Sequence, residues 1–269
     1  MPAFKQTGDA VALPHPMALR VVRALCRCVL RLLRIRVQWQ GAEPANGGAL
    51  LVANHFSWLD IVAVLASTDC SFVAKREVRR WPIVGWCAEA IGVVWIDRTR
   101  KRDLLRSLPL LRERLAAGQR VLLFPEGTTT DGRAVLPFRS ALYDAAVWPG
   151  VPVQALALTA SARGNARVLS WTGRDTLLGS LTRLVRLRDA RVDITALPTM
   201  SATVVDSRAA RRQARQLLAR HTRGDRTGGG AGRHSDRAER GARCRAYGRN
   251  RLVKQNLRPM ESSEREMER

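Results

Sequence analysis

The stretch that decides the fold is ALLVANHFSWLD, residues 49–60. Its first five residues, Ala49–Ala53, are all apolar and follow two glycines, which is typical of a buried strand. The segment that begins at Ser57 has the pattern of a helix and continues to Ser67. We therefore predict a buried strand, a short polar loop that contains His55, and a helix.

The same alternation of short apolar runs and helical segments continues along the chain. We predict further strands over residues 70–74, 92–96, 121–124, 151–159, 168–172 and 191–196. We predict further helices over residues 81–91, 102–117, 141–147 and 208–220. Strands that alternate with helices indicate an α/β domain, here with a mixed, largely parallel sheet flanked by helices.

The two ends of the chain differ from this domain in composition. We divide the chain into a flexible N-terminus (1–15), a basic amphipathic helix (16–40), the α/β domain (41–220) and a C-terminal tail (221–269). The tail is dense in Arg and Gly and poor in apolar residues, so it cannot bury enough surface to offset its ordering entropy and is predicted to be disordered. The first residues lack the charged start and apolar stretch of a signal peptide.

The segment from Met17 to Val37 is apolar but carries arginines three or four residues apart. These are Arg20, Arg23, Arg27, Arg31 and Arg34. On a helix they form one stripe, and each would cost roughly 2.5–3.5 kcal/mol at the centre of a bilayer. We predict a helix that lies in the membrane interface with its arginines on lipid phosphates. The alternative is an ordinary amphipathic helix that packs on the domain and leaves its arginines in water.

Charge and cysteine content limit the classes of partner and site. The 269 residues include 46 Lys and Arg against 23 Asp and Glu, a net charge of +23. Such a charge favours a polyanionic partner, either nucleic acid or an anionic membrane surface. Five cysteines, without a C-x-x-C pair, argue against a disulfide framework or a zinc site and fit a reducing compartment. We predict no metal site.

His55 and Asp60 form the first candidate catalytic pair. Five residues apart, they would not share a face inside one helix, because five steps turn the chain by about 500°. They can meet if His55 lies in the loop and Asp60 in the first turn of the helix. Asp60 would then fix the imidazole and leave its other nitrogen as a general base. The alternative is structural, because Ser57 and Asp60 also match a helix capping box.

Two further motifs follow predicted strands. The stretch FPEGTT, residues 124–129, contains Gly127, which permits a tight turn whose amides and hydroxyls can bind an anion. The stretch GVVWIDR, residues 92–98, places Arg98 just past a strand end, where a guanidinium suits a phosphate. The alternatives are a plain turn and a solvated arginine.

Four motifs occur in one order along the chain: N-H-x-S-x-x-D at 54–60, G-x-x-x-I-x-R at 92–98, F-P-E-G-T at 124–128 and V-P-V at 151–153. Together they resemble the glycerolipid acyltransferases, specifically the 1-acyl-sn-glycerol-3-phosphate (lysophosphatidate) acyltransferase type. The resemblance covers about residues 45–200 and implies that residues 41–220 are the acyltransferase domain.

The resemblance implies a mechanism without a covalent enzyme intermediate. His55 would act as general base on the free hydroxyl of a lysophospholipid, and Asp60 would orient the imidazole. The hydroxyl would attack the thioester of acyl-CoA or acyl-carrier protein, the co-substrate, and no cofactor is implied. The remaining positions that match the family carry two kinds of role: acceptor headgroup binding for Arg98, Glu126, Gly127 and Thr128, and support of the motifs for Asn54, Ser57, Pro125 and Pro152. Because Glu126 is anionic, it is better suited to hold Arg98 or a glycerol hydroxyl than a phosphate.

A lipid substrate implies an interfacial enzyme, and soluble acyl donors imply the cytoplasmic face of the inner membrane. The apolar segment Trp81–Trp95 suits the headgroup boundary, although a core helix explains it equally well. Lyso-ornithine lipid and glycerol-3-phosphate are further candidate acceptors. Two hypotheses lie outside acyl transfer, a basic nucleic-acid-binding protein and an inactive scaffold. We predict no specific nucleic-acid partner, because no recognition module is visible.

Overall fold

The stretch ALLVANHFSWLD forms the predicted strand, loop and helix at the centre of the fold. Strand β2 spans Ala49–Ala53 and helix α2 spans Trp58–Ser67. All five residues of β2 are buried, which explains why its sequence is apolar without alternation. Ser57 caps α2, since its hydroxyl accepts a hydrogen bond from the Leu59 amide (3.3 Å).

The computed structural model describes residues 14–41, 43, 47–97, 101–132, 134–138, 150–162, 169–171, 175–187, 189–200, 212, 214–216, 218 and 219. All of them belong to one compact unit, Met1–Asp225. The predicted flexible residues 1–13, the helix at 141–147, the tail from 221 and Arg98 lie outside the described residues.

Most of the described elements lie where the sequence predicts them. The other strands are β1 (Arg36–Gly41), β3 (Ser71–Lys75), β4 (Val94–Ile96), β5 (Arg120–Leu123), β6 (Val153–Ser161) and β7 (Arg191–Ala196). The other helices are α1 (Pro16–Leu32), the 3-10 helix η1 (Arg76–Arg80), α3 (Val84–Ala90), α4 (Lys101–Ala116) and α6 (Leu177–Val185).

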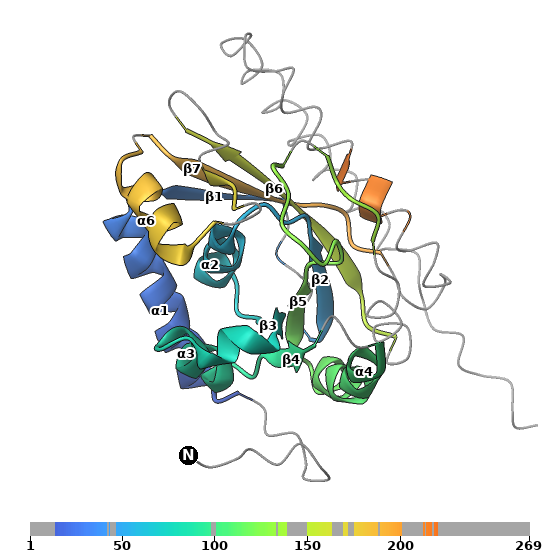
Figure 1. Ribbon diagram of the computed structural model, residues 1–269. Helices are drawn as coiled ribbons and strands as arrows, with labels where there is room; N and C mark the ends of the chain where they lie inside the picture. Colours follow the sequence, from blue (N-terminus) through green and yellow to red (C-terminus); the bar gives the residue numbers. More distant parts are fainter. Residues whose placement is uncertain are drawn as a thin grey trace, which may run out of the picture. The chain divides into compact units, whose positions relative to one another are not determined.

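The strands form one mixed sheet, in the order β1-β7-β6-β2-β5-β3-β4. Only β6 and β7 pair antiparallel, and all the other neighbours pair parallel. The predicted fold class is therefore confirmed. Because β2, β5, β3 and β4 are parallel, their carboxyl ends lie at the same edge of the sheet, where His55 follows β2 (Figure 1).

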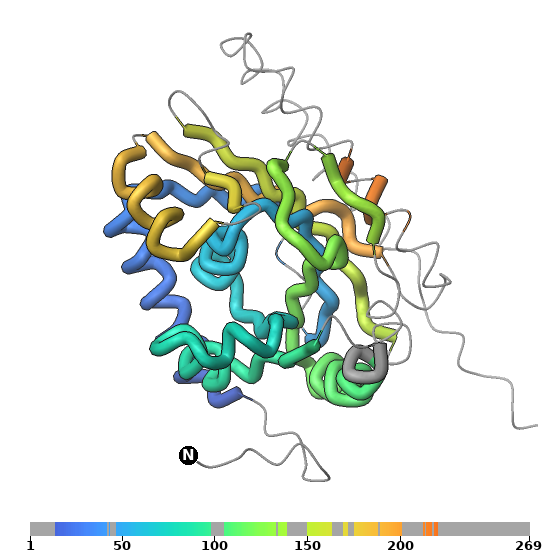
Figure 2. Tube along the Cα trace, viewed as in Figure 1, coloured from blue at the N-terminus to red at the C-terminus, as the bar shows by residue number. Residues whose placement is uncertain are grey.

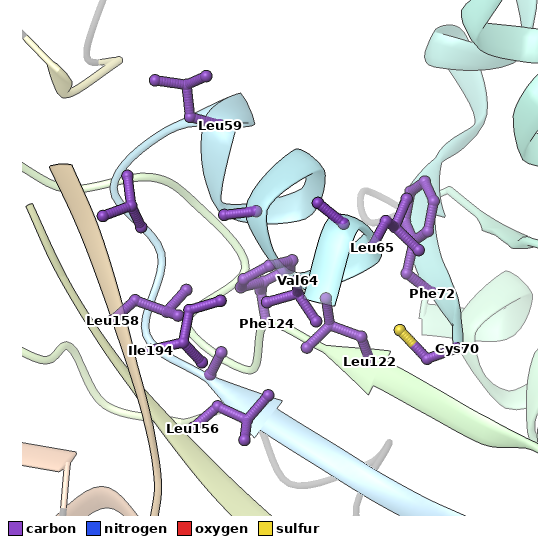
Figure 3. Packing of buried hydrophobic residues seen from close by; sticks show 14 of the residues in the cluster. Leu59, Val64, Leu65, Cys70, Phe72, Leu122, Phe124, Leu156, Leu158 and Ile194 are labelled. Carbon is purple, nitrogen blue, oxygen red and sulfur yellow. The ribbon is translucent and has the colours of Figure 1, made fainter. Parts of the chain in front are cut away.

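Helices cover both faces of the sheet. Leu51 of β2 belongs to a buried cluster shared with α1, α2, α3 and α6, whereas its neighbours Leu50 and Val52 belong to a second cluster shared with α4. This split follows from the alternation of side chains along a strand. The tube in Figure 2 shows α4 separated by the sheet from α1, α2, α3 and α6. Figure 3 shows the first cluster, with Val64 of α2 lying among Leu122, Leu156 and other sheet residues.

The predicted helix over residues 16–40 is too long. Helix α1 ends at Leu32, Arg34 adopts a positive φ of 55°, and β1 begins at Arg36. In β1 the half-buried Val37 and Trp39 alternate with exposed polar residues, which is the period of a strand. The strand is bonded to β7 at the edge of the sheet.

The strand predicted over 168–172 is also wrong where it is described. Residues 169–171 form no strand, and the Trp171 amide instead donates to the Phe56 carbonyl (2.7 Å). This segment therefore pairs with the loop beside His55 and not with the sheet. Elements β1, η1 and α6 were not predicted from the sequence.

Candidate active site

The site is built on the loop between β2 and α2, and Asn54 fixes the start of that loop. Its side-chain amide donates to the Leu158 carbonyl (2.9 Å), and its side-chain oxygen accepts from the Leu158 amide (2.8 Å). Asn54 thus pairs with β6 as a backbone peptide would. The loop leaves the sheet at a defined point, one residue before His55.

Asp60 holds the His55 ring. Its Oδ2 accepts hydrogen bonds from His55 Nδ1 (2.7 Å), the Phe56 amide (2.7 Å) and the Ser57 amide (2.9 Å). Asp60 is fully buried, and burial raises its pKa while the bonds from His55, Ser57 and Phe56 oppose that rise. Three N–H donors directed at one oxygen favour the ionised carboxylate. The capping box with Ser57 is present as well, so the catalytic and structural interpretations describe the same contacts.

Glu126 holds the backbone of His55 from the neighbouring strand. It follows β5, is buried, and accepts from the His55 amide through Oε1 (2.9 Å) and from the Leu136 amide through Oε2 (2.9 Å). Burial raises the pKa of Glu126, and the two amide bonds oppose this rise. Both carboxylate oxygens are thus occupied by backbone amides. These contacts give Glu126 a positioning role, and its contact with the acceptor stays a prediction.

The loop that follows β5, residues 124–130, makes further contacts with His55, and we call it the motif loop. The Thr130 amide donates to the His55 carbonyl (2.9 Å), and the Thr130 hydroxyl reaches the same oxygen (3.2 Å). The Phe124 ring stacks on the imidazole, with centroids 4.0 Å apart and an interplanar angle of 22°. Neither Thr130 nor Phe124 was predicted from the sequence as a site residue. Only Phe124 carries a signal, as the first residue of the F-P-E-G-T motif.

The remaining predicted site residues take several positions. Gly127 has a φ of 73° and donates its amide to the Phe124 carbonyl (3.1 Å), which forms the expected tight turn. Thr128 is exposed, whereas Pro125 is buried. The Pro152 carbonyl accepts from the Leu50 amide (2.9 Å), so Pro152 helps to join β6 to β2. The structure therefore brings His55, Asp60 and Glu126 together with the motif loop.

His55 is 9% exposed, at the carboxyl ends of β2 and β5. Ligands of α/β sheets bind at such ends.

Among the described residues no group of three or more His, Cys, Asp or Glu side chains could hold a metal ion, and the lack of a cofactor remains a prediction. Burial raises the pKa of Cys26 to about 11 and that of Cys70 to about 12, so these thiols are poor nucleophiles near neutral pH.

Comparison with known proteins gives the same assignment as the motifs. The family model described as "Acyltransferase" matches residues 34–159. A lyso-ornithine lipid O-acyltransferase of Pseudomonas aeruginosa is 35% identical over 204 residues, which cover 76% of this chain and 78% of that protein. The chain belongs to the acyltransferase family. The family resemblance inferred from the four motifs is thereby confirmed.

Two further comparisons extend the assignment of this acyltransferase. A 1-acyl-sn-glycerol-3-phosphate acyltransferase of Neisseria meningitidis serogroup B is 40% identical over 140 residues, or 52% of this chain. That match spans 55% of the Neisseria protein, so the chain matches about half the length of this relative. The crystal structure of the 1-acyl-sn-glycerophosphate acyltransferase PlsC from Thermotoga maritima superposes with a TM-score of 0.61 at 22% identity, covering 81% of each chain. This likeness concerns the fold.

Proposed function

We propose that this acyltransferase moves a fatty acyl group from an acyl thioester to the free hydroxyl of lysophosphatidate and so forms phosphatidate. The single observation that carries the proposal is the 2.7 Å bond between His55 Nδ1 and the buried Asp60 carboxylate. It lies in the family's own motif and turns a histidine into an oriented base. The Neisseria relative, which acts on this acceptor by its name, supports the choice of substrate.

The chemistry follows from the direction of the imidazole. With Nδ1–H donating to Asp60, the lone pair of Nε2 takes the proton of the acceptor hydroxyl as the oxygen attacks the thioester carbonyl. The new carbon–oxygen bond forms, the tetrahedral intermediate collapses, and the carbon–sulfur bond breaks. The imidazolium returns its proton to the departing thiolate, so no charge is left over. Base catalysis of this kind contributes about 10²–10⁴-fold to the rate.

The acceptor headgroup is proposed to bind along the carboxyl edge of β4 and β5. Arg98 lies two residues beyond β4, and Thr128 lies on the motif loop whose residue Thr130 bonds to His55. An arginine, an exposed hydroxyl and the Gly127 turn suit a phosphate monoester. Acyl-CoA and acyl-carrier protein remain the proposed donors.

Lyso-ornithine lipid is the second candidate acceptor. The specific observation in its favour is the Pseudomonas relative, which matches over 78% of its own length, whereas the Neisseria relative matches over 55%. A zwitterionic acceptor does not need a phosphate-binding arginine. Arg98→Ala therefore distinguishes the two candidates: it abolishes transfer to lysophosphatidate and spares transfer to lyso-ornithine lipid.

Attachment to the membrane through α1 completes the proposal. Met17, Val21, Leu25 and Val29 are exposed on α1 and lie four residues apart, so they form one apolar stripe. The arginine stripe is divided: Arg23 Nη2 donates to the Ser67 carbonyl (3.3 Å) and Arg27 Nε to the Ala66 carbonyl (2.9 Å), both at the end of α2. Arg20, Arg31 and Arg34 are exposed and available to lipid phosphates.

No helix among the described residues combines the length and the apolar character needed to cross a bilayer. The proposed mode of attachment is interfacial, at the cytoplasmic face of the inner membrane, where acyl thioesters are available.

The test is acyl transfer by the purified full-length protein in detergent, from labelled acyl-CoA or acyl-carrier protein to each acceptor. The wild type is expected to form phosphatidate, and His55→Ala to lose about 10²–10⁴-fold of this activity. His234→Ala, in the tail, is the matched control and keeps full activity. A folded His55→Ala variant with wild-type activity would overturn the mechanism.

A further inference from the structure

Helix α6 presents apolar side chains to the outside of the molecule. Leu178, Leu181 and Val185 are spaced three and four residues apart and are all exposed, Leu178 by 71%. Ser180 and Leu184 are the buried residues of the same helix. Leu184 lies three residues from Leu181 on the same side of the helix, so α6 is amphipathic but leaves most of its apolar face exposed.

The turn before α3 presents a second apolar group. Ile83 has φ 64° and ψ −54°, and the Val84 amide donates to the Pro82 carbonyl (2.6 Å), which closes a γ-turn of the strained, positive-φ form. A β-branched residue in this conformation is rare, and such strain concentrates at functional sites. The turn leaves Ile83 68% exposed, with Trp86 of α3 73% exposed close by in the sequence.

We call these two groups together the docking rim. It consists of Leu178, Leu181 and Val185 of α6 and of Ile83, Val84 and Trp86 at the start of α3.

Both halves of the docking rim are tied to the catalytic loop. On the α6 side, the Trp58 indole N–H donates to the Ser180 hydroxyl (3.1 Å). On the α3 side, the Trp81 ring stacks on Trp171 with centroids 6.4 Å apart, and the Trp171 amide bonds to the Phe56 carbonyl. Phe56 and Trp58 are residues that follow His55 toward α2. The docking rim is therefore anchored to the segment that carries the base.

The charges beside the docking rim match an anionic lipid surface. Arg76 and Arg80 of η1 precede the strained turn and are exposed, and Arg186 is exposed at the end of α6. The exposed acidic residues of the same segment, Glu77 and Glu89, pair with Lys75 (3.2 Å) and Arg79 (2.6 Å). Apolar side chains bordered by arginines are typical of proteins that insert into the headgroup boundary. Helices α6, α1 and α3 follow one another along one side of the structure, on the sheet face opposite α4 (Figure 1). Both parts of the docking rim therefore belong to helices on the same sheet face as α1.

We propose that the docking rim inserts into an anionic bilayer and holds the catalytic loop against the lipid surface, so that the acceptor reaches His55 directly from the membrane. The proposal rests on the proposed function only for the nature of the acceptor. Binding of the rim to vesicles is independent of any catalysis.

The test uses full-length protein with the double substitution Leu178→Glu/Trp86→Glu. The matched control is Leu105→Glu, because Leu105 is 49% exposed on α4, which packs on the other face of the sheet. In flotation with phosphatidylglycerol–phosphatidylethanolamine vesicles, the double variant is expected to bind at least about tenfold more weakly than the wild type. Leu105→Glu is expected to bind as the wild type does. Single Leu178→Ser and Trp86→Ser variants carry the same test if the double variant does not fold.

Activity assays on vesicle-borne and on monomeric acceptor distinguish membrane docking from the chemical step. The double variant is expected to lose about tenfold or more of its activity on vesicle-borne lysolipid and to keep its activity on a short-chain, monomeric lysophosphatidate. Unchanged vesicle binding of the folded variant overturns the proposal. So does a change from dimer to monomer in light scattering with vesicle binding retained, because the rim would then contact a second copy of the chain. A wild type that floats but acylates no acceptor overturns the proposed function and leaves the rim supported.

Discussion

The Asp60→Asn substitution is the sharpest test of the catalytic pair. Asn has nearly the same shape as Asp and keeps an oxygen where Oδ2 accepts hydrogen bonds from His55, Phe56 and Ser57. It removes the negative charge that stabilises the imidazolium formed when His55 takes the acceptor proton. The substitution therefore separates charge from geometry.

The magnitude follows from the short contact. The bonded atoms His55 Nδ1 and Asp60 Oδ2 are 2.7 Å apart, which puts the centres of the two charged groups roughly 4 Å apart. At an effective dielectric constant of about 20, unit charges at that separation interact by about 4 kcal/mol. A loss of this size in the transition state lowers the rate by about 10³-fold. KM is expected to change little, because the fully buried Asp60 carboxylate does not contact the acceptor.

The assay is steady-state acyl transfer with kcat and KM measured separately, alongside thermal unfolding. Asp69→Asn is the matched control: Asp69 lies just beyond the other end of α2 and pairs with Arg23 (3.3 Å) in a partly exposed ion pair. Its loss is expected to cost at most about 1 kcal/mol of stability and no activity. The reasoning is refuted if folded Asp60→Asn loses less than about tenfold in kcat. Because the pair acts as a unit, adding Asp60→Asn to His55→Ala is expected to cause little further loss.

Three further predictions concern the framework of the site. Burial raises the pKa of Glu126 above 4.5, so between pH 4.5 and that raised pKa the native state keeps a proton that the unfolded chain has released. This contribution to stability is therefore lost as the pH rises through the window, and urea unfolding is expected to show a fall for the wild type relative to Glu126→Gln. Asn54→Asp places a carboxylate against the Leu158 carbonyl, and we expect a loss of about 1–3 kcal/mol in urea unfolding together with lower kcat. Leu51→Ala removes fully buried volume from β2 and is expected to cost about 2–5 kcal/mol of stability while leaving kcat of the folded fraction unchanged.

Local pattern was sufficient to predict the centre of the fold. β2 and α2 form as expected because each has a single period over its whole length, all-apolar for β2 and helical for α2. β1 was missed because Val37 and Trp39 follow an arginine-striped helix without a Gly or Pro between them. The break occurs at Arg34, where a non-glycine residue adopts a positive φ, and the sequence carries no signal for that. Helix α6 was missed because Gly179 lies inside it, although its apolar residues recur at helical spacing.

The candidate site also has one part that was predictable from the sequence and one part that was not. The pairing of His55 with Asp60 was predictable because both residues lie within one strand–loop–helix turn. The hydrogen bonds from Glu126 and Thr130 to His55 were not predictable, because these residues are 71 and 75 positions away in sequence and bond to the His55 backbone. A backbone amide or carbonyl is the same for every residue, so no side-chain pattern at position 55 records the contact. The parallel pairing of β5 with β2 is what brings the two loops together.

The contacts around Asp60 explain why the capping box and the catalytic pair cannot be separated in this fold. The carboxylate must be ionised to orient the imidazole, yet its complete burial raises its pKa and disfavours the charge. The Phe56 and Ser57 amides offset part of that cost by donating to the same Oδ2. Ser57 is the N-cap of α2 and Phe56 precedes it, so neither amide has a partner inside the helix. The start of α2 therefore supplies the donors that keep the orienting group charged, and any substitution that shifts the start of this helix is expected to lower activity before it unfolds the protein.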